Sequence, residues 1–274
     1  MKKSIRTLNN HQQRVIVGFL GIALFVGLIS WNWMGAVCLF SVFLFLSLYE
    51  FYSLSPYKIP KLWKVLATFI GFFLFFLLVL TDLSQSESRF RLFLFLSPVF
   101  LIFLVFSKLE KPFESLSWIV TGWFYLITPW LCMLLIIGDF PYNPGLLLGL
   151  FGLLWAADSG AYFAGRTLGK TKLLPRISPK KSWEGLIGGL VCACLLAYGL
   201  SVWVGVFSDF QWLILATSTT IFGTLGDLAE STLKRSLGIK DSGNILPGHG
   251  GILDRFDGLF VAAPINYLIA VFFF

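Results

Sequence analysis

The stretch "LWKVLATFIGFFLFFLLVLT", residues 62–81, carries one charged side chain, that of Lys64, in twenty positions. An α-helix needs about 20 mostly apolar residues to cross the hydrocarbon core of a bilayer. A barrel strand would alternate apolar and polar residues, which this stretch does not do. Similar runs recur through all 274 residues, of which 57% are hydrophobic and 13% charged, whereas soluble domains are about 25% charged. The sequence therefore predicts an all-α, polytopic helical membrane protein.

The apolar runs predict about nine transmembrane helices in one integral membrane domain, residues 1–274. The chain has no repeat, linker or low-complexity segment that would divide it. Residues 1–150 have the character of generic transmembrane helices, and the unusual polar loops lie in 151–274. No cleavable signal peptide is expected, because the first run lacks a small-residue cleavage site. The expected spans are 15–30, 33–54, 62–81, 92–106, 117–137, 144–163, 186–206, 211–233 and 257–274.

The distribution of basic residues predicts the orientation of these spans. With a cytoplasmic N-terminus, 19 of the 21 Lys and Arg residues fall on the cytoplasmic side, and only Arg89 and Arg91 fall on the other. The polar loops 164–185 and 234–256 then share the cytoplasmic side. This topology accounts for most of the net charge of +7. It does not account for the Gly, His and Asp residues in the same loops.

Four acidic residues lie within or beside the last two spans. Asp227 and Glu230 are three residues apart, as are Asp254 and Asp257, so each pair would share one face of a helix. Ionisable groups in a membrane span are expensive and are functional candidates by default. Carboxylates near the membrane boundary suit Mg²⁺, which takes one or two of them together with water and substrate phosphate. The structural alternative is a salt bridge, for example between Glu230 and Lys234; it is weaker for Asp227, which has no basic residue one turn away.

A glycine-rich loop, "SGNILPGHGG" (242–251), separates these two spans. Glycine permits positive φ angles and close backbone approach to a ligand, and consecutive free N–H groups can form an anion-binding nest. Glycine and proline also make ordinary turns, so the loop alone is a weak signal. Cations surround it, and together they predict a phosphate pocket. The residues expected to bind phosphate here are Lys234, Arg235, Lys240, His249, Gly250, Gly251 and Arg255.

The other polar loop contains "SPKKSWEG", which begins at Ser178. Ser178, Lys180, Lys181 and Ser182 combine ammonium groups and hydroxyls, which suit a polyphosphate ligand. The alternative is a juxtamembrane basic cluster attracted to anionic lipid head groups. Both interpretations are compatible with a substrate that is itself a lipid phosphate. Asp158 stands at the end of the span that leads into this loop.

The segment "STLKRSLGIKDSGNILPGHGGILDRFD", residues 231–257, resembles the hallmark of the phosphatidate cytidylyltransferases, also called CDP-diacylglycerol synthases. The segments "DSGAYFAGR" (158–166), "SPKKSWEG" (178–185) and "GDLAES" (226–231) are similar to family segments and occur in the expected order. The resemblance covers roughly residues 155–260. A 27-residue pattern with fixed gaps is far more specific than a single glycine motif.

The resemblance implies an enzyme of the bacterial inner membrane that faces the cytoplasm. It would condense CTP with phosphatidate, giving CDP-diacylglycerol and pyrophosphate. It also implies Mg²⁺ as a cofactor, K⁺ as a possible second cation and a homodimer in the lipid bilayer, with no nucleic-acid partner. By the same analogy Asp227 and Asp254 are metal ligands, and we expect Asp257 and Glu230 to complete or surround the metal site. With Lys234 and Arg235, Asp227 and Asp254 form the expected catalytic set.

Three other functions are alternatives to this one. A CDP-alcohol phosphotransferase is disfavoured, because its expected "DxxDGxxAR" pattern is absent. A cytidylyltransferase acting on another lipid phosphate stays open. A transporter of an anionic solute would need charged positions along a path to the far side, yet the ionisable groups gather at one face.

Overall fold

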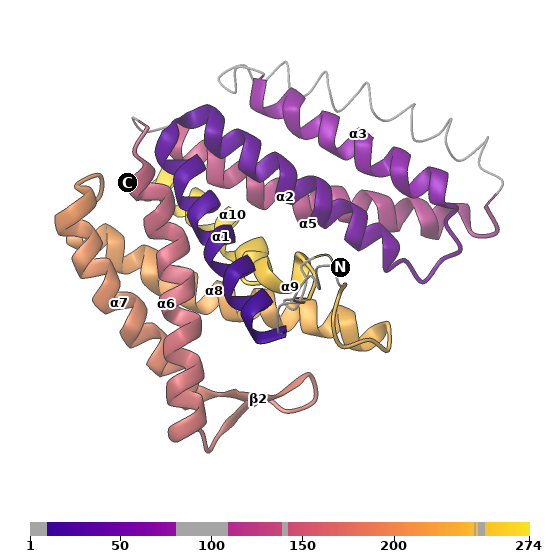
Figure 1. Ribbon diagram of the computed structural model, residues 1–274. Helices are drawn as coiled ribbons and strands as arrows, with labels where there is room; N and C mark the ends of the chain where they lie inside the picture. The colour runs from indigo at the N-terminus through magenta and orange to yellow at the C-terminus, as the bar shows by residue number, and fades with distance from the viewer. Residues whose placement is uncertain (1–9, 81–108, 139–141, 244, 246–249) are drawn as a thin grey trace, which may run out of the picture.

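The computed structural model describes residues 10–80, 109–138, 142–243, 245 and 250–274 of the chain, and it is almost entirely helical (Figure 1). Within these residues seven helices are long and apolar enough to cross a membrane. These are α2 (Trp33–Ser53), α3 (Lys61–Leu80), α5 (Pro112–Gly138), α6 (Pro144–Thr167), α7 (Trp183–Val204) and α8 (Asp209–Ser236). The seventh is the continuous segment Leu253–Phe273, which consists of α9 (Leu253–Phe256) and α10 (Leu259–Phe273).

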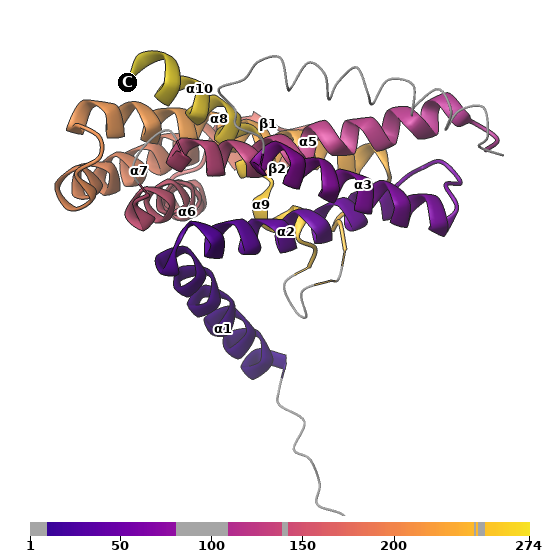
Figure 2. The same cartoon turned by 90° about the horizontal axis from the view of Figure 1, so that it is seen from above.

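An eighth helix, α1 (Asn10–Trp31), contributes a shorter apolar part, Gly18–Trp31, and projects away from the other helices in Figure 2. These eight elements match eight of the nine predicted spans. The remaining one, 92–106, lies outside the described residues. The helical membrane architecture is therefore confirmed, whereas the count of nine and the cytoplasmic N-terminus stay predictions.

The prediction of an all-α protein missed one element. Residues expected to form a plain polar loop make an antiparallel hairpin, in which β1 (Lys172–Leu174) pairs with β2 (Ser178–Ser182). The first residues of α7 hold this hairpin. Glu184 accepts hydrogen bonds from the Thr171 N–H at 3.0 Å and the Lys170 N–H at 3.2 Å, and Ser182 caps the helix by accepting from the Gly185 N–H at 3.2 Å.

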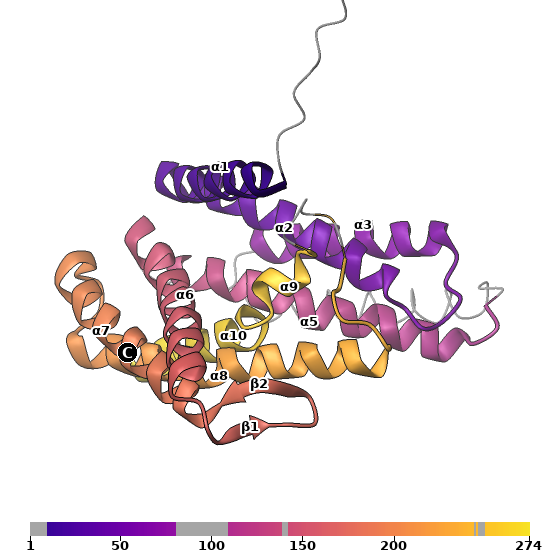
Figure 3. The same ribbon diagram turned by 60° about the horizontal axis from the view of Figure 1, so that its bottom comes forward.

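The helices pack in two groups joined by α10. Helices α6, α7 and α8 contact one another, α2, α3 and α5 form the second group, and α10 contacts both α5 and α8 (Figures 1 and 3). Small residues permit the close contact of α6 with α7, as expected for helix packing in a membrane. A Cβ placed on Gly160 would lie 2.6 Å from the Gly188 backbone oxygen.

Aromatic side chains pack around α9 where it meets α2 and α5. The Phe256 ring of α9 lies 4.9 Å, centroid to centroid, from both Trp130 of α5 and Phe43 of α2. Phe40 contacts the same Trp130 ring at 5.2 Å. The short helix α9 is thus anchored between α2 and α5, and this position decides where its Asp254 and the following Asp257 lie.

Candidate active site

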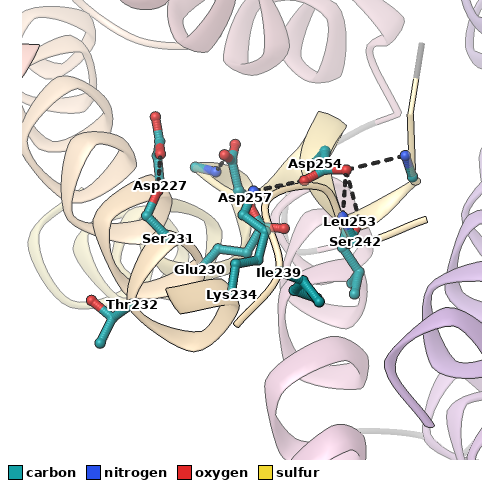
Figure 4. Close-up of polar contacts among 12 residues, drawn as sticks. Asp227, Glu230, Ser231, Thr232, Lys234, Ile239, Ser242, Leu253, Asp254 and Asp257 are labelled. Atoms are coloured by element: carbon teal, nitrogen blue, oxygen red, sulfur yellow. Dashed lines mark hydrogen bonds and ion pairs between the residues drawn. The ribbon is translucent and has the colours of Figure 1, made fainter. Parts of the chain in front are cut away.

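The C-terminal half of α8 and the short helix α9 form the centre of the candidate site (Figure 4). Asp227, Glu230 and Lys234 stand on one face of α8, because residues three and four apart on a helix are neighbours. Glycine allows the second element to come close. A Cβ on Gly226 would lie 2.5 Å from the Asp257 backbone oxygen, so the α9–α10 junction contacts α8 at this point.

Lys234 connects the two helices through a pair of carboxylates. Its Nζ lies 2.6 Å from Asp254 Oδ1 and 3.2 Å from Glu230 Oε2. The side chains of Lys234, Glu230 and Asp254 are only 12%, 1% and 10% exposed. The salt bridge considered from sequence for Glu230 is therefore present, and Lys234 also pairs with Asp254.

Asp227 has a basic partner that sequence spacing did not reveal. Lys181 Nζ of β2 lies 2.6 Å from Asp227 Oδ2 and 3.4 Å from the Thr224 backbone oxygen, while Ser231 Oγ donates to Asp227 Oδ1 at 3.2 Å. No basic residue lies one turn from Asp227 on α8, as the spacing indicated, yet the salt bridge that was the weaker alternative for this residue forms with a lysine from another element. Figure 3 shows the hairpin alongside α8, so the two polar loops contribute to one site.

Asp254 is held by the backbone that precedes it. The Ser242 N–H donates to Asp254 Oδ2 at 2.9 Å, and the Gly251 N–H donates to the same oxygen at 3.1 Å; the Ser242 Oγ lies 2.9 Å from it. Gly250 has a φ of +86°, which favours glycine. The Gly251 N–H therefore serves a protein carboxylate, although the sequence had suggested a phosphate cradle at Gly250 and Gly251.

Glu50 of α2 is a residue that the sequence interpretation missed. It is 3% exposed and accepts hydrogen bonds from Ser242 Oγ and from the N–H groups of Ile252 and Leu253. The available signal was a lone acid in the span "FLFLSLYEFYS", residues 43–53, where a carboxylate is expensive.

The remaining predicted site residues differ in how exposed their side chains are. The side chains of Lys180, Arg235, Lys240 and Arg255 are exposed, as expected for groups that meet a soluble ligand. Arg235 donates to the Ile239 backbone oxygen at 3.1 Å. Ser178 is half-buried on β2, and Ser182 is buried as the cap of α7 rather than open to a ligand. His249 lies outside the described residues.

The acidic residues could hold a divalent cation only if substrate phosphate or water supplied the remaining ligands. In the described part of the chain, no three His, Cys, Asp or Glu side chains gather into a ready-made ion site. Mg²⁺ does not require one, since it commonly takes one or two carboxylates and substrate phosphate. Glu230 Oε1 is buried and finds no hydrogen-bond partner within the described ranges, and Asp257 is close enough to Glu230, Asp227 and Asp158 to interact with their charges. A cation, or a proton shared between Glu230 and Asp257, would offset the repulsion among these carboxyl groups.

Comparison with known proteins places the chain in a family. A family model described as "Cytidylyltransferase family" matches residues 12–273. A phosphatidate cytidylyltransferase of Bacillus subtilis is 34% identical over 268 residues, which are 95% of this chain and 98% of the relative. Proteins of the same name from Haemophilus influenzae and Brucella suis are 52% and 45% identical, over 43% and 58% of their own lengths, so these two matches span about half of each relative. The chain belongs to the cytidylyltransferase family.

Proposed function

We propose that this chain transfers the cytidylyl group of CTP to phosphatidate, producing CDP-diacylglycerol and pyrophosphate. The relatives named above carry the name of this activity, and the chain matches the Bacillus subtilis protein over nearly its whole length. The observation that carries the proposal is the convergence of both polar loops on α8. Lys181 meets Asp227 from the hairpin, and Asp254 meets Lys234 from α9.

The reaction joins two anions and needs little acid–base help. A phosphate oxygen of phosphatidate forms a bond to the α-phosphorus of CTP, and the bond from that phosphorus to the β-phosphate bridging oxygen breaks. Pyrophosphate leaves with the electron pair. Phosphomonoesters have a second pKa near ~6, so the attacking phosphate is largely a dianion at neutral pH. The protein must mainly bring the two phosphates together and stabilise charge on the leaving group.

The side chains of this site suit that task. The ammonium groups of Lys181 and Lys234, with the exposed Lys180, Arg235, Lys240 and Arg255 around them, would attract and orient phosphates. Asp227 and Asp254 would hold Mg²⁺, with Asp257 and Glu230 beside them, and the bound ion would supply charge neutralisation to the phosphates. A second, monovalent cation such as K⁺ is part of the same proposal and rests on the family resemblance.

An apolar hollow beside the site offers a place for the acyl chains. It has a volume of about 430 Å³ between α5 and α10 and is lined by Thr121, Phe124, Tyr125, Thr128 and Phe260, among others. Both helices belong to candidate membrane spans. Tyr125, which lines the hollow, is close enough to Glu230 and Asp257 to interact with their charges. We infer that the lipid enters sideways here, with its phosphate toward the acids.

The location of the protein follows from the same proposal. An enzyme that draws one substrate from the bilayer and CTP from the cytoplasm needs its site at the cytoplasmic face of the inner membrane, where the charge distribution of the sequence also puts it. Assembly as a homodimer rests on the family resemblance alone.

The test is a purified-protein assay of pyrophosphate and CDP-diacylglycerol formation from CTP, with and without phosphatidate. We expect product only when both substrates and Mg²⁺ are present. Asp227→Asn and Asp254→Asn should each abolish the activity, and near-normal turnover of either variant at saturating Mg²⁺ would overturn the metal assignment. If the protein used another lipid phosphate but not phosphatidate, cytidylyl transfer would stand as the reaction and phosphatidate would be wrong as the substrate.

A further inference from the structure

Glu50 is a buried carboxylate outside the acidic centre just described. It lies near the C-terminal end of α2, in the half of the chain that otherwise consists of apolar helices, and it is 3% exposed. A buried charged group is costly unless hydrogen bonds compensate it. All three of its described hydrogen bonds reach residues about 200 positions further along the chain.

These hydrogen bonds hold the start of α9. The Ile252 N–H donates to Glu50 Oε2 at 2.8 Å, and the Leu253 N–H donates to Oε1 at 3.4 Å. The first N–H groups of a helix have no partner within the helix, and the N-cap residue of α9, Ile252, provides no side-chain cap. Glu50 therefore supplies from another helix the acceptor that this helix start lacks.

The Glu50 carboxylate also touches the segment that orients Asp254. Ser242 Oγ donates to Glu50 Oε1 and lies 2.9 Å from Asp254 Oδ2, so one hydroxyl stands between the two carboxylates. The Ser242 and Gly251 N–H groups bind the same Asp254 oxygen, which leaves Oδ1 directed at Lys234. Figure 4 shows Ser242 on one side of Asp254 and Lys234 on the other.

Close packing around Glu50 leaves little freedom for this arrangement. A Cβ on Gly251 would overlap the Glu50 carboxylate and the Ser242 hydroxyl, and one on Gly243 would lie 3.0 Å from Glu50 Cδ. Glycine at these two positions thus lets the loop close over a carboxylate from α2. If these glycines served only to form a turn, a buried carboxylate from α2 would not be needed beside them.

We propose that Glu50 is a positioning residue, which sets the orientation of the Asp254 carboxylate through Ser242 and the backbone of α9. The expected effect of Glu50 on kcat rests on the proposed function, because Asp254 belongs to the proposed metal and phosphate site. It gives the N-terminal half of the chain a specific part in the reaction.

The variants are Glu50→Gln, Glu50→Asp and Ser242→Ala, with Ser47→Ala as the matched control. Ser47 is buried on the same helix, one turn before Glu50, and its hydroxyl has no hydrogen-bond partner in the described part of the protein. Two readouts are needed: kcat and KM for CTP and phosphatidate over a range of Mg²⁺ concentrations, and amide hydrogen exchange of peptides covering residues 242–258 in the intact protein.

We expect Glu50→Gln and Ser242→Ala to lower kcat by about 10- to 100-fold, the usual cost of losing a group that orients a metal ligand, and to raise the Mg²⁺ concentration needed for half-maximal rate. Glu50→Asp should recover part of the loss, and Ser47→Ala should match wild type. In Glu50→Gln, exchange should become faster at residues 250–254 and stay unchanged at 209–226.

Normal kcat and Mg²⁺ dependence in a folded Glu50→Gln protein would overturn the proposal, as would unchanged exchange at residues 250–254. If Glu50→Gln does not fold, Ser242→Ala decides by the same criteria. If wild-type protein makes no CDP-diacylglycerol, the proposed function fails by itself, and the exchange experiment still decides whether Glu50 holds the segment around Asp254.

Discussion

Lys181 on the hairpin and Asp227 on α8 form an ion pair with 2.6 Å between Nζ and Oδ2. The two residues are 46 positions apart, and their side chains are 23% and 36% exposed. Pairs this accessible contribute little to stability. The pair joins the hairpin to α8, and under the proposed function Lys181 would bind anions rather than hold the fold.

The first prediction concerns Lys181. Lys181→Met should lower kcat/KM by about 100-fold or more, because it removes a charge that would stabilise transferring phosphate. Thermal unfolding in detergent should change little. The matched control is Lys172→Met, which removes an exposed lysine from the partner strand and should keep at least half of the activity. An equal loss of kcat/KM in both variants would show that Lys181 only attracts anions in general and does not contact the transferring phosphate.

The second prediction concerns Lys234, which lies between two buried carboxylates. Lys234→Met should destabilise the protein by about 3–5 kcal/mol, because it leaves Glu230 and Asp254 buried without their cation. Adding Glu230→Gln to this variant should recover part of the unfolding temperature without recovering activity. A Lys234→Met protein as stable as wild type would show that the carboxylates have another source of neutralisation.

The third prediction concerns Gly226, at the contact between α8 and the α9–α10 junction. Gly226→Ala should cost about 1–3 kcal/mol of stability, the usual cost of overpacking, and should lower kcat by displacing Asp257. Gly199→Ala is the control, since a Cβ at Gly199 of α7 meets no atom within 4 Å. That substitution should be neutral or slightly stabilising, because alanine favours a helix more than glycine does. Denaturation and activity of both variants, measured in the same detergent, provide the comparison.

The fourth prediction tests the hollow between α5 and α10. Thr121→Trp and Thr128→Trp should raise KM for phosphatidate several-fold and leave KM for CTP unchanged, because a large side chain would occupy the space proposed for acyl chains. Leu195→Trp places the same side chain on a 70% exposed position of α7 and should change neither constant. An effect on CTP alone would place the nucleotide, rather than the lipid, beside this hollow.

Several features of the fold could be predicted from single segments of the sequence. Each transmembrane helix is a local property, since an apolar run of about 20 residues has no other stable way to cross a bilayer. Seven of the expected spans correspond to described helices that are long and apolar enough to cross a membrane for this reason. The carboxylates of α8 could be assigned to one face because helical periodicity relates residues three and four apart.

The hairpin and the role of Ser182 could not be predicted in this way. Strand pairing between Lys172 and Ser182 depends on contacts that a three-residue strand does not signal by itself. The hydroxyl of Ser182 had the chemistry of a phosphate ligand, but its position at the start of α7 made it a helix cap.

The sequence by itself determined that this chain is a helical membrane protein with acids in or beside its last two spans and cations in two polar loops, because hydrophobicity and helical spacing act over short distances along the chain. Only the tertiary structure decided which charges meet. Lys181 reaches Asp227, and Glu50 reaches the start of α9, across helices far apart in sequence. Such pairings depend on helix packing, on the glycines that let backbones approach, and on the need to satisfy every buried polar group, none of which can be read from one segment alone.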